Sequence, residues 1–456
     1  MSREQNRREF TAAAAGALAS GAGATARPGF PAPVDPKELA INGGKPVRST
    51  RLTAGYWGAD YYDAAEEREV LEVVKSKTPF RWYGAAKPTK VLNFERDYAR
   101  HQGTKYAVAV TSGTSALISA ISALEVGPGD EVILPAWTWY SCYNAIVLAG
   151  GLPVFAEVDE TLNLDPKDLD RKITPKTKVI MAVHILGGPA DMDPILEIAR
   201  SRKIRILEDF AQSVGGRYKG KQLGSIGDIG ICSFQVNKTI SAGEGGAVVT
   251  SDPVLFERAA RFHDLGGLRP AHEELIGKPQ LAWFVGGQYR MSEFTGAVMG
   301  AQLKKLDAML ESSRGNFRRV RAAISDLPGL RQRRLPDPDG DIGSGIFIAL
   351  KDAKQRDQFI AAMNKENVST GKLSGSVILP TAEHIEKKIT LHPNWPSFNT
   401  PRGKSIPYGR AACPQTLDVF DRFAAVHLHP KYSEKDVDDV IAAITKVHMA
   451  LFAPRG

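Results

Sequence analysis

The segments ILEDFAQSVGG (Ile206–Gly216) and CSFQVNKTISAGEGGAVVT (Cys232–Thr250) decide how this chain folds. Each contains a short, mostly apolar run, which is the pattern of a buried strand. The first run ends in Asp209, and the second is followed by Lys238, a glycine-rich turn and a third such run. The glycines allow a tight backbone path close to a bound group. The pattern therefore predicts strands that deliver a carboxylate and an amine to the same sheet edge.

Asp209 and Lys238 together match the needs of one cofactor, pyridoxal phosphate (PLP). PLP requires a lysine amine that holds its aldehyde and a carboxylate that keeps its pyridine nitrogen protonated, so that the ring accepts electrons. Taken alone, a loop lysine is usually a solvated charge, and an aspartate after a strand is often a helix cap. The two residues lie far apart in the sequence, so only a folded chain can bring them together. Their joint occurrence favours a cofactor site.

A predicted anion site precedes both residues. The strand pattern of residues 106–110 leads into Thr111-Ser-Gly-Thr-Ser115, and residues 116–124 have the small and apolar composition of a buried helix. Free N–H groups and the helix dipole favour phosphate at a helix N-terminus, although many such turns serve only to cap the helix. Because this turn comes before the aspartate and lysine, we expect it to bind the cofactor phosphate. The residues assigned to this contact are Gly113, Thr114 and Ser115.

The motifs ED-x-AQ and SF-xxx-K-xxxx-GEGG-A, in this order, resemble those of the DegT/DnrJ/StrS family of PLP-dependent sugar aminotransferases. The resemblance extends from about Leu39 to His448. It implies an α/β fold of the PLP-dependent transferase type (fold type I, aspartate aminotransferase-like), with a large, mostly parallel sheet domain and a smaller C-terminal α/β domain. It also implies the roles of four residues, which are Lys238 as the cofactor lysine, Asp209 as the pyridine partner, Gln212 as a second cofactor contact and Ser233 as a phosphate ligand.

Two further cofactor contacts are implied by motif position. A flat pyridine ring needs an aromatic plate, whose offset stacking contributes about 1 kcal/mol. In PAWTW the motif selects Trp139 rather than Trp137, with the alternative that both are core residues. The segment GGQYRMSE (Gly286–Glu293) resembles the family's G-x-N-x-R-M-S-E, whose asparagine reaches the phosphate of the neighbouring subunit. Gln288 stands at that position here, and the contact would make the protein a homodimer with a shared active site.

The order of motifs also predicts the domain organisation. A chain of 456 residues is long enough for two domains. Repeated strand, helix and strand patterns up to about residue 250 predict right-handed crossovers and a largely parallel sheet, with the site beyond the C-terminal strand edges. We expect three parts, namely a signal-like or disordered segment (1–35), a PLP-binding large domain with its lead-in (36–311) and a small C-terminal domain (312–456). A long helix is expected to begin near Glu293 and run through Leu310.

Composition excludes several other classes of protein. The net charge of +8 is dispersed, which indicates a solvated basic surface or attraction for an anionic substrate, and no nucleic-acid-binding motif is present. No apolar run reaches the roughly 18 residues of a membrane span. Three scattered cysteines do not form a disulfide framework, and no metal-ligand spacing occurs. His427 and His429 alternate on a predicted strand, and the family's C-terminal LPLHP pattern favours a structural role for them over a metal pair.

The N-terminus has the composition of an export signal. The charged segment NRREF (Asn6–Phe10) precedes an Ala/Gly-rich stretch that ends in an A-x-A pattern at Ala24–Ala26. Arg7 and Arg8 resemble a twin-arginine signal, which would carry a folded, cofactor-loaded protein to the periplasm. The alternative is an Ala-rich tail on a cytoplasmic enzyme, where nucleotide sugars and amino donors are mainly found.

The expected activity is ping-pong transamination from glutamate or glutamine to a keto-sugar, in sugar or polysaccharide biosynthesis. Lys238 is the expected general base and acid, while His184 is a weak acid/base candidate that fits a core histidine better. One alternative is a PLP-dependent sugar dehydratase, but those relatives carry histidine in place of Lys238. Another is a non-catalytic, PLP-binding regulatory protein. Gln235 resembles the branch that acts on keto-inositols, and both a keto-cyclitol and a nucleotide-linked keto-hexose remain open as substrates.

Overall fold

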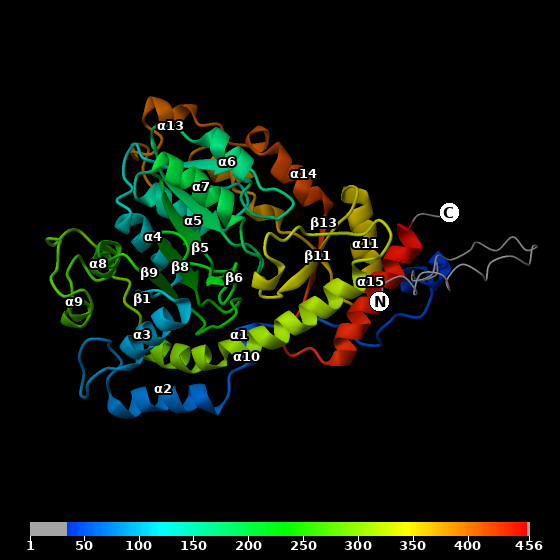
Figure 1. Cartoon of the computed structure of the whole chain (residues 1–456), viewed down its shortest axis with the longest axis horizontal. Helices are drawn as coiled ribbons and strands as arrows, with labels where there is room; N and C mark the ends of the chain where they lie inside the picture. Colours follow the sequence, from blue (N-terminus) through cyan, green and yellow to red (C-terminus); the bar gives the residue numbers. More distant parts are fainter. Residues whose placement is uncertain (1–33, 454–456) are drawn as a thin grey trace, which may run out of the picture.

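The computed structural model describes residues 34–453 (Figure 1). The predicted export signal at residues 1–26 lies outside the described residues. Within 34–453, no helix combines the length and the apolar character needed to cross a membrane.

A seven-stranded sheet forms the centre of the larger part of the molecule (Figure 1). Its strands lie in the order β1-β9-β8-β5-β4-β2-β3, and β9 alone runs antiparallel to its neighbours. The prediction of a largely parallel sheet is therefore confirmed. The strands are β1 (Tyr106–Val110), β2 (Glu131–Pro135), β3 (Leu152–Ala156), β4 (Thr177–Val183), β5 (Arg205–Asp209), β8 (Ile229–Ser233) and β9 (Gly246–Thr250).

Helices connect most of the parallel strands, and α4, α6 and α8 begin at side-chain caps that the sequence supplies. Ser112 caps α4, and Asp252 followed by Pro253 begins α8, as the free N–H groups of a first turn require. Because each crossover returns the chain to the same end of the sheet, all parallel strands finish at one edge. The helices of this part are α3 (Lys90–Gln102), α4 (Gly113–Ala123), α5 (Tyr140–Leu148), α6 (Pro166–Lys172), α7 (Met192–Arg202), α8 (Pro253–Phe262) and α9 (Pro270–Ile276).

A smaller four-stranded antiparallel sheet lies in the C-terminal part, with the strand order β10-β11-β13-β12. Its side chains form a second hydrophobic cluster with α11, α15 and the end of α10. The elements are β10 (Arg331–Gln332), β11 (Gly345–Ala349), α11 (Ala353–Lys365), β12 (Gly371–Lys372), α14 (Pro414–Arg422), β13 (Phe423–His427) and α15 (Glu434–Leu451).

One long helix, α10 (Glu293–Ile324), runs from beside α3 to beside α15 (Figure 1). The sequence predicted its start, but the helix continues well beyond Leu310. Its first half packs on α2 (Ala64–Ser76) and α3, and its second half packs on α15 and β11. Residues 311 and 312, where the sequence predicts a domain boundary, therefore lie inside a continuous helix.

The segment of residues 371–407, which the sequence left unplaced, packs on the larger hydrophobic cluster. The Trp395 indole donates to the carbonyl of Val147 at 2.6 Å, and Arg402 pairs with the buried Glu131 at 2.5 Å. This segment thus ties the C-terminal part of the chain to the large sheet. The remaining short elements are α1 (Trp57–Asp60), α12 (Glu383–Glu386), α13 (Pro401–Ser405), β6 (Arg217–Tyr218), β7 (Lys221–Gln222) and the 3-10 turns Pro36–Glu38, Ala40–Asn42, Pro338–Gly340, Gly375–Val377, Leu379–Thr381 and Arg410–Ala412.

Candidate active site

A cavity of about 890 Å³ opens where the parallel strands of the large sheet end. It brings together most of the residues that the sequence selected, from segments far apart in the chain. The predicted residues that line it are Gly113, Thr114, Trp139, Asp209, Gln212, Ser233 and Lys238. Ser115 and Gln288 do not line it.

Asp209 is the last residue of β5 and is buried at the cavity wall. Its carboxylate accepts hydrogen bonds from the backbone N–H of Ala211 at 2.9 Å and from the thiol of Cys142 at 3.2 Å. Burial raises the pKa of this carboxyl, while the two hydrogen bonds and the charge of Lys238 act in the opposite direction. A buried carboxylate of this kind is stabilised by a cationic partner in the cavity.

Lys238 lies in the loop that joins the antiparallel strands β8 and β9. Two backbone hydrogen bonds close the loop, from Phe234 N–H to Gly245 O at 2.8 Å and from Val236 N–H to Gly243 O at 3.1 Å. Gly243 has φ +81°, which is why a glycine is needed in this turn. Burial lowers the pKa of the Lys238 amine, and the Asp209 carboxylate opposes that effect. The lowered pKa favours the neutral amine that acts as a nucleophile or base.

The N-terminus of α4 points its first turn at the cavity. The Ser112 hydroxyl accepts from the Ser115 N–H at 3.0 Å and caps the helix. The Ser115 hydroxyl bonds to Thr111 and Ser112, at 2.7 Å each, so Ser115 is used inside the cap and not in the cavity. The cavity is therefore lined by Gly113 and Thr114. Their N–H groups belong to the first turn of the helix, where no intrahelical carbonyl accepts from them.

Two glycines allow the close approach of the strands to this helix. A Cβ atom on Gly113 would lie 2.7 Å from the Ser233 Cβ, and one on Gly246 would lie 2.4 Å from the Ser112 carbonyl oxygen. The last glycine of the GEGG motif is thus required because β9 passes directly behind the turn. The result is a small cradle of backbone N–H groups and hydroxyls, which fits a phosphate group.

The two tryptophans of the PAWTW motif have different environments. Trp137 is a core residue whose indole donates to the Ser374 carbonyl at 3.3 Å. Trp139 is 60% exposed and lines the cavity, so the alternative that both tryptophans are core residues is wrong. The segment after β12 holds this turn in place, because the N–H of Thr138 donates to the carbonyl of Val377 at 3.3 Å.

The polar neighbours of Asp209 have structural partners. Gln212 accepts from the Leu186 N–H at 3.1 Å, which fixes its amide at the cavity edge. His184 is fully buried, with Nδ1 accepting from the Ala190 N–H at 3.0 Å and Nε2 3.0 Å from the Glu208 carboxylate. His184 is therefore a satisfied core histidine, as its sequence context favoured.

Gln288 lies outside the cavity, in an exposed loop before α10. This placement leaves its side chain free to reach a second copy of the chain, and the predicted contact stays a prediction. Among the described residues, no group of histidine, cysteine or carboxylate side chains has the arrangement of a metal site.

Sequence reasoning missed one support and one wall of the cavity. The support is Cys142, one helical turn after Trp139 on α5, which donates to Asp209. The wall comes from the small sheet and includes Ser344, Thr370 and His427. Nothing in the local sequence identifies Ser344 or Thr370 as cavity residues. The position of His427 near the end of a predicted strand could have marked it as a candidate, because side chains at strand ends often line such sites.

The donor set fits PLP: a phosphate cradle at a helix N-terminus, a buried carboxylate, an exposed aromatic plate and a half-buried lysine line one cavity at the C-terminal edge of a parallel sheet. This combination defines the class of PLP-dependent transferases of fold type I. The chain belongs to the DegT/DnrJ/EryC1/StrS aminotransferase family, whose sequence profile matches residues 61–445. Membership confirms the predicted cofactor and the predicted fold, because this is a family of PLP-dependent enzymes.

Individual relatives agree with this assignment. The chain is 33% identical over 388 residues to the spore coat polysaccharide biosynthesis protein SpsC of Bacillus subtilis (strain 168), covering 84% of this chain and 94% of that protein. It is 40% identical over 233 residues to the GDP-perosamine synthase of Escherichia coli O157:H7, covering 50% and 62% of the two chains. Among solved structures, 3-amino-5-hydroxybenzoic acid synthase superposes with a TM-score of 0.72 at 27% identity, covering 88% and 99%.

Proposed function

We propose that this chain is an aminotransferase that moves an amino group from glutamate or glutamine to the keto group of a sugar, either a nucleotide-linked keto-hexose or a keto-cyclitol, in sugar or polysaccharide biosynthesis. The observation that carries the proposal is the meeting of the Lys238 amine and the Asp209 carboxylate in one cavity with a phosphate cradle. The name of the Bacillus relative, a spore coat polysaccharide biosynthesis protein, supports the biosynthetic setting.

Each residue has a role that its environment supports. PLP, when bound, supplies an aldehyde that exchanges amines and a ring that accepts electrons. The first turn of α4, with Thr114 and Ser233, would bind the phosphate, and Trp139 would stack on the ring. Asp209 would hold a proton on the ring nitrogen. Because burial lowers its pKa, the Lys238 amine would be able to take the α-proton of the donor and to release it at the carbon that was the cofactor's aldehyde.

The site is proposed to be completed by a second copy of the chain. Gln288 lies in a loop that also exposes two large apolar side chains, Trp283 (77% exposed) and Val285 (91% exposed). Exposed apolar residues next to a polar contact residue are typical of an interface. A homodimer would cover them and bring Gln288 to the phosphate of the neighbouring cavity.

Mixing two inactive variants tests the shared site. In a mixed dimer of Lys238→Ala with Gln288→Ala, one site combines an intact Lys238 with an intact Gln288 from the other chain. We expect activity to recover on mixing and subunit exchange. Sedimentation as a monomer, or no recovery in a proven mixed dimer, would show that Gln288 acts within its own chain or not at all.

An absorbance spectrum tests the proposed activity. Purified protein with PLP should show the visible band of the lysine-bound cofactor, and glutamate or glutamine should convert it to the shorter-wavelength amine form. A keto-sugar should then restore the band. A band that does not respond to any amino donor would refute transamination and favour a dehydratase or a regulatory protein.

Export is a separate proposal that rests on the sequence of residues 1–26. Replacement of both Arg7 and Arg8 by lysine should keep the protein in the cytoplasm, if the pair forms a twin-arginine signal. Cell fractionation of the unchanged chain gives the reference. An unchanged cytoplasmic location in both proteins would refute export.

A further inference from the structure

The small sheet contributes a polar wall to the cavity, and none of the residues of this wall is assigned to the cofactor. Three of its residues are Ser344 before β11, Thr370 before β12 and His427 at the end of β13. They are separate from the phosphate cradle and from Asp209, which belong to the large sheet. A wall of this kind is placed to contact the substrate that the cofactor acts on.

The charge of the cavity limits the chemistry of that substrate. Among the described residues that line it, Lys238 is the one lysine or arginine, and it is the proposed cofactor lysine. Asp209 and Glu244 add two carboxylates. A sugar diphosphate carries negative charges that proteins bind mainly with arginine and lysine. Beyond the phosphate cradle, the described residues of one chain's cavity therefore offer no free cation to a diphosphate.

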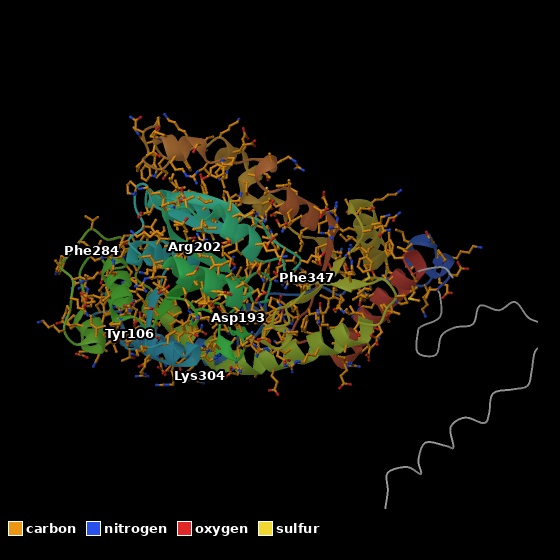
Figure 2. All side chains as sticks on the ribbon, turned by 45° about the horizontal axis from the view of Figure 1, so that its top comes forward. Tyr106, Asp193, Arg202, Phe284, Lys304 and Phe347 are labelled. Atoms are coloured by element: carbon orange, nitrogen blue, oxygen red, sulfur yellow. The ribbon has the colours of Figure 1, made fainter. Side chains whose placement is uncertain are left out.

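Two arginines near Gln288, Arg269 and Arg290, are already paired within the chain. Arg269 contacts the buried Asp264 carboxylate at 2.7 Å, and Arg290 contacts the same carboxylate. Phe284 of the loop before α10 also lies well apart from Phe347, which packs on the polar wall (Figure 2). The charge of both arginines is therefore partly neutralised by Asp264, and neither is an unpaired cation.

His427 has the environment of a ligand-binding side chain. It lines the cavity and is solvent-accessible, and its ring is held edge-on by Phe347 with the ring centroids 6.0 Å apart. Desolvation by the cavity walls around the accessible ring lowers the pKa of His427, and a backbone hydrogen bond at Ser344 opposes that shift. The lowered pKa favours the neutral imidazole. A neutral imidazole whose N–H is shared with the backbone of Ser344 still presents a nitrogen acceptor, which can pair with a hydroxyl group.

The hydroxyl groups of the other two residues of the wall already donate hydrogen bonds within the chain. The Ser344 hydroxyl donates to the carbonyl of Leu186 at 2.7 Å, and the Thr370 hydroxyl donates to the carbonyl of Val368 at 3.2 Å. With their protons engaged, both hydroxyls present acceptor oxygens to the cavity. Acceptor oxygens and a neutral imidazole together match a ring that carries several hydroxyl groups.

We propose that this cavity takes an uncharged, polyhydroxylated ring ketone and that His427 is a hydrogen-bonding contact to one of its hydroxyl groups. The inference rests on the proposed aminotransferase function and narrows its substrate class. It assigns His427 to substrate specificity and not to the proton transfer, which Lys238 carries out.

The first test compares two probes on the holoenzyme. The protein is converted with glutamate, and the return of the visible band is then followed with a keto-inositol and with a UDP-linked keto-hexose. We expect the keto-inositol to restore the band with a rate per concentration at least about tenfold higher. Faster recovery with the UDP-linked probe would overturn the substrate class. Glutamate is added before the ketone. If the visible band does not respond to glutamate, the proposed aminotransferase function fails, and the substrate class is tested only after this first step succeeds.

The second test uses two substitutions of His427 in the holoenzyme, with the keto-inositol as the probe. His427→Phe keeps a ring against Phe347 but removes both hydrogen-bonding atoms, and His427→Gln keeps a donor and an acceptor. We expect the phenylalanine variant to raise KM for the ketone about tenfold or more with the glutamate conversion rate unchanged. The glutamine variant should stay within about threefold of the unchanged protein.

His392→Phe is the matched control, because His392 is exposed and lies outside the cavity lining. It should leave both half-reactions unchanged. An unaltered ketone KM in His427→Phe, or an equal loss in the glutamate reaction, would show that His427 does not recognise the ketone.

Discussion

The thiol of Cys142 donates a hydrogen bond to Oδ2 of Asp209, with the sulfur 3.2 Å from the oxygen and both side chains buried. Cys142 lies on α5, in the turn that follows Trp139, whereas Asp209 ends β5. This contact connects the segment of the aromatic plate to the proposed partner of the ring nitrogen. It also means that a residue with no catalytic chemistry of its own helps to set the charge of Asp209.

Cys142→Ala should shift the acid limb of the activity profile to higher pH. Burial raises the pKa of Asp209 and the Cys142 thiol lowers it, so removal of the thiol leaves a higher pKa. The carboxyl then takes up a proton at a higher pH. The measurement is kcat against pH. Cys413→Ala, which removes a buried thiol bonded to a backbone carbonyl outside the cavity, is the control. Superimposable profiles for Cys142→Ala and the control would contradict the expectation.

Asp209→Asn should inactivate the enzyme and stabilise the protein free of PLP. Burial raises the pKa of Asp209 above 3.8, so the folded protein favours the protonated carboxyl. The resulting contribution to stability is fully present below pH 3.8 and is lost as pH rises through the raised pKa. An uncharged asparagine avoids that loss, so Tm at pH 7 should rise by a few degrees, with a smaller difference towards pH 4. Turnover should fall about 10²–10³-fold. A lower Tm of Asp209→Asn than of the unchanged protein at pH 7 would contradict the expected stabilisation.

Lys238→Ala should abolish transamination and the visible band of the bound cofactor. No other lysine lines the cavity among the described residues, so nothing can replace its amine. Lys221→Ala, at an exposed position on β7, is the control and should behave like the unchanged protein. The readouts are the absorbance spectrum and the amino transfer from glutamate. Turnover that survives in Lys238→Ala would end the assignment of this residue.

Gly246→Ala should weaken PLP binding. Its Cβ would lie 2.4 Å from the Ser112 carbonyl oxygen, and backbone cannot move aside as the end of a flexible side chain can. The turn before α4 must therefore shift, and we expect the Kd for PLP to rise at least about tenfold. Gly300→Ala is the control, since Gly300 has open space around its Cβ position inside α10 and should gain about 1 kcal/mol. Equal PLP affinities in the two variants would disprove the role of the close approach.

Glu95→Gln should destabilise the fold by about 3–5 kcal/mol, because Arg81 would remain buried without its partner. The Glu95 carboxylate contacts the Arg81 guanidinium at 2.8 Å and accepts from the Ala109 N–H at 2.7 Å. Burial alone would raise the pKa of Glu95, but Arg81, His272 and the Ala109 N–H lower it to about 2. This contribution is therefore present above about pH 4.5 and is lost as pH falls towards 2.

Urea unfolding with saturating PLP measures the change in Glu95→Gln, and the exposed Glu311→Gln is the matched control. The destabilisation should shrink below pH 4.5 because the carboxyl of the unchanged protein is then losing its charge. Equal unfolding midpoints for the two variants at pH 7 would contradict the role of this buried pair.

The sequence predicted the strands, and most of the residues that line the cavity, well where local patterns carry the information. Residues 106–110 were predicted as a strand and form β1, and the turn before α4 was predicted from its serine, glycine and threonine content. The same turn also shows the limit. Ser112 and Ser115 have equal propensities for a cap, and only the packed turn shows that Ser115 bonds inside it.

Elements whose extent depends on distant partners were predicted less well. The sequence predicted that α10 ends at Leu310, but the helix continues to Ile324 because Phe317, Val320 and Ile324 pack in the second hydrophobic cluster. The segment of residues 371–407 lacks periodicity and could not be placed. It is ordered by contacts such as that between Trp395 and Val147, which no local pattern encodes.

By itself the sequence determined the class of this protein through the strand and helix pattern along the chain, the glycine positions, and the aspartate and lysine that PLP chemistry requires. These follow from residue type and short-range spacing. The tertiary structure decided which distant side chains meet, including Cys142 with Asp209 and the His427 wall with the cofactor end of the cavity. Such contacts arise from packing between segments far apart in the chain, where burial and geometry set hydrogen bonding and pKa together.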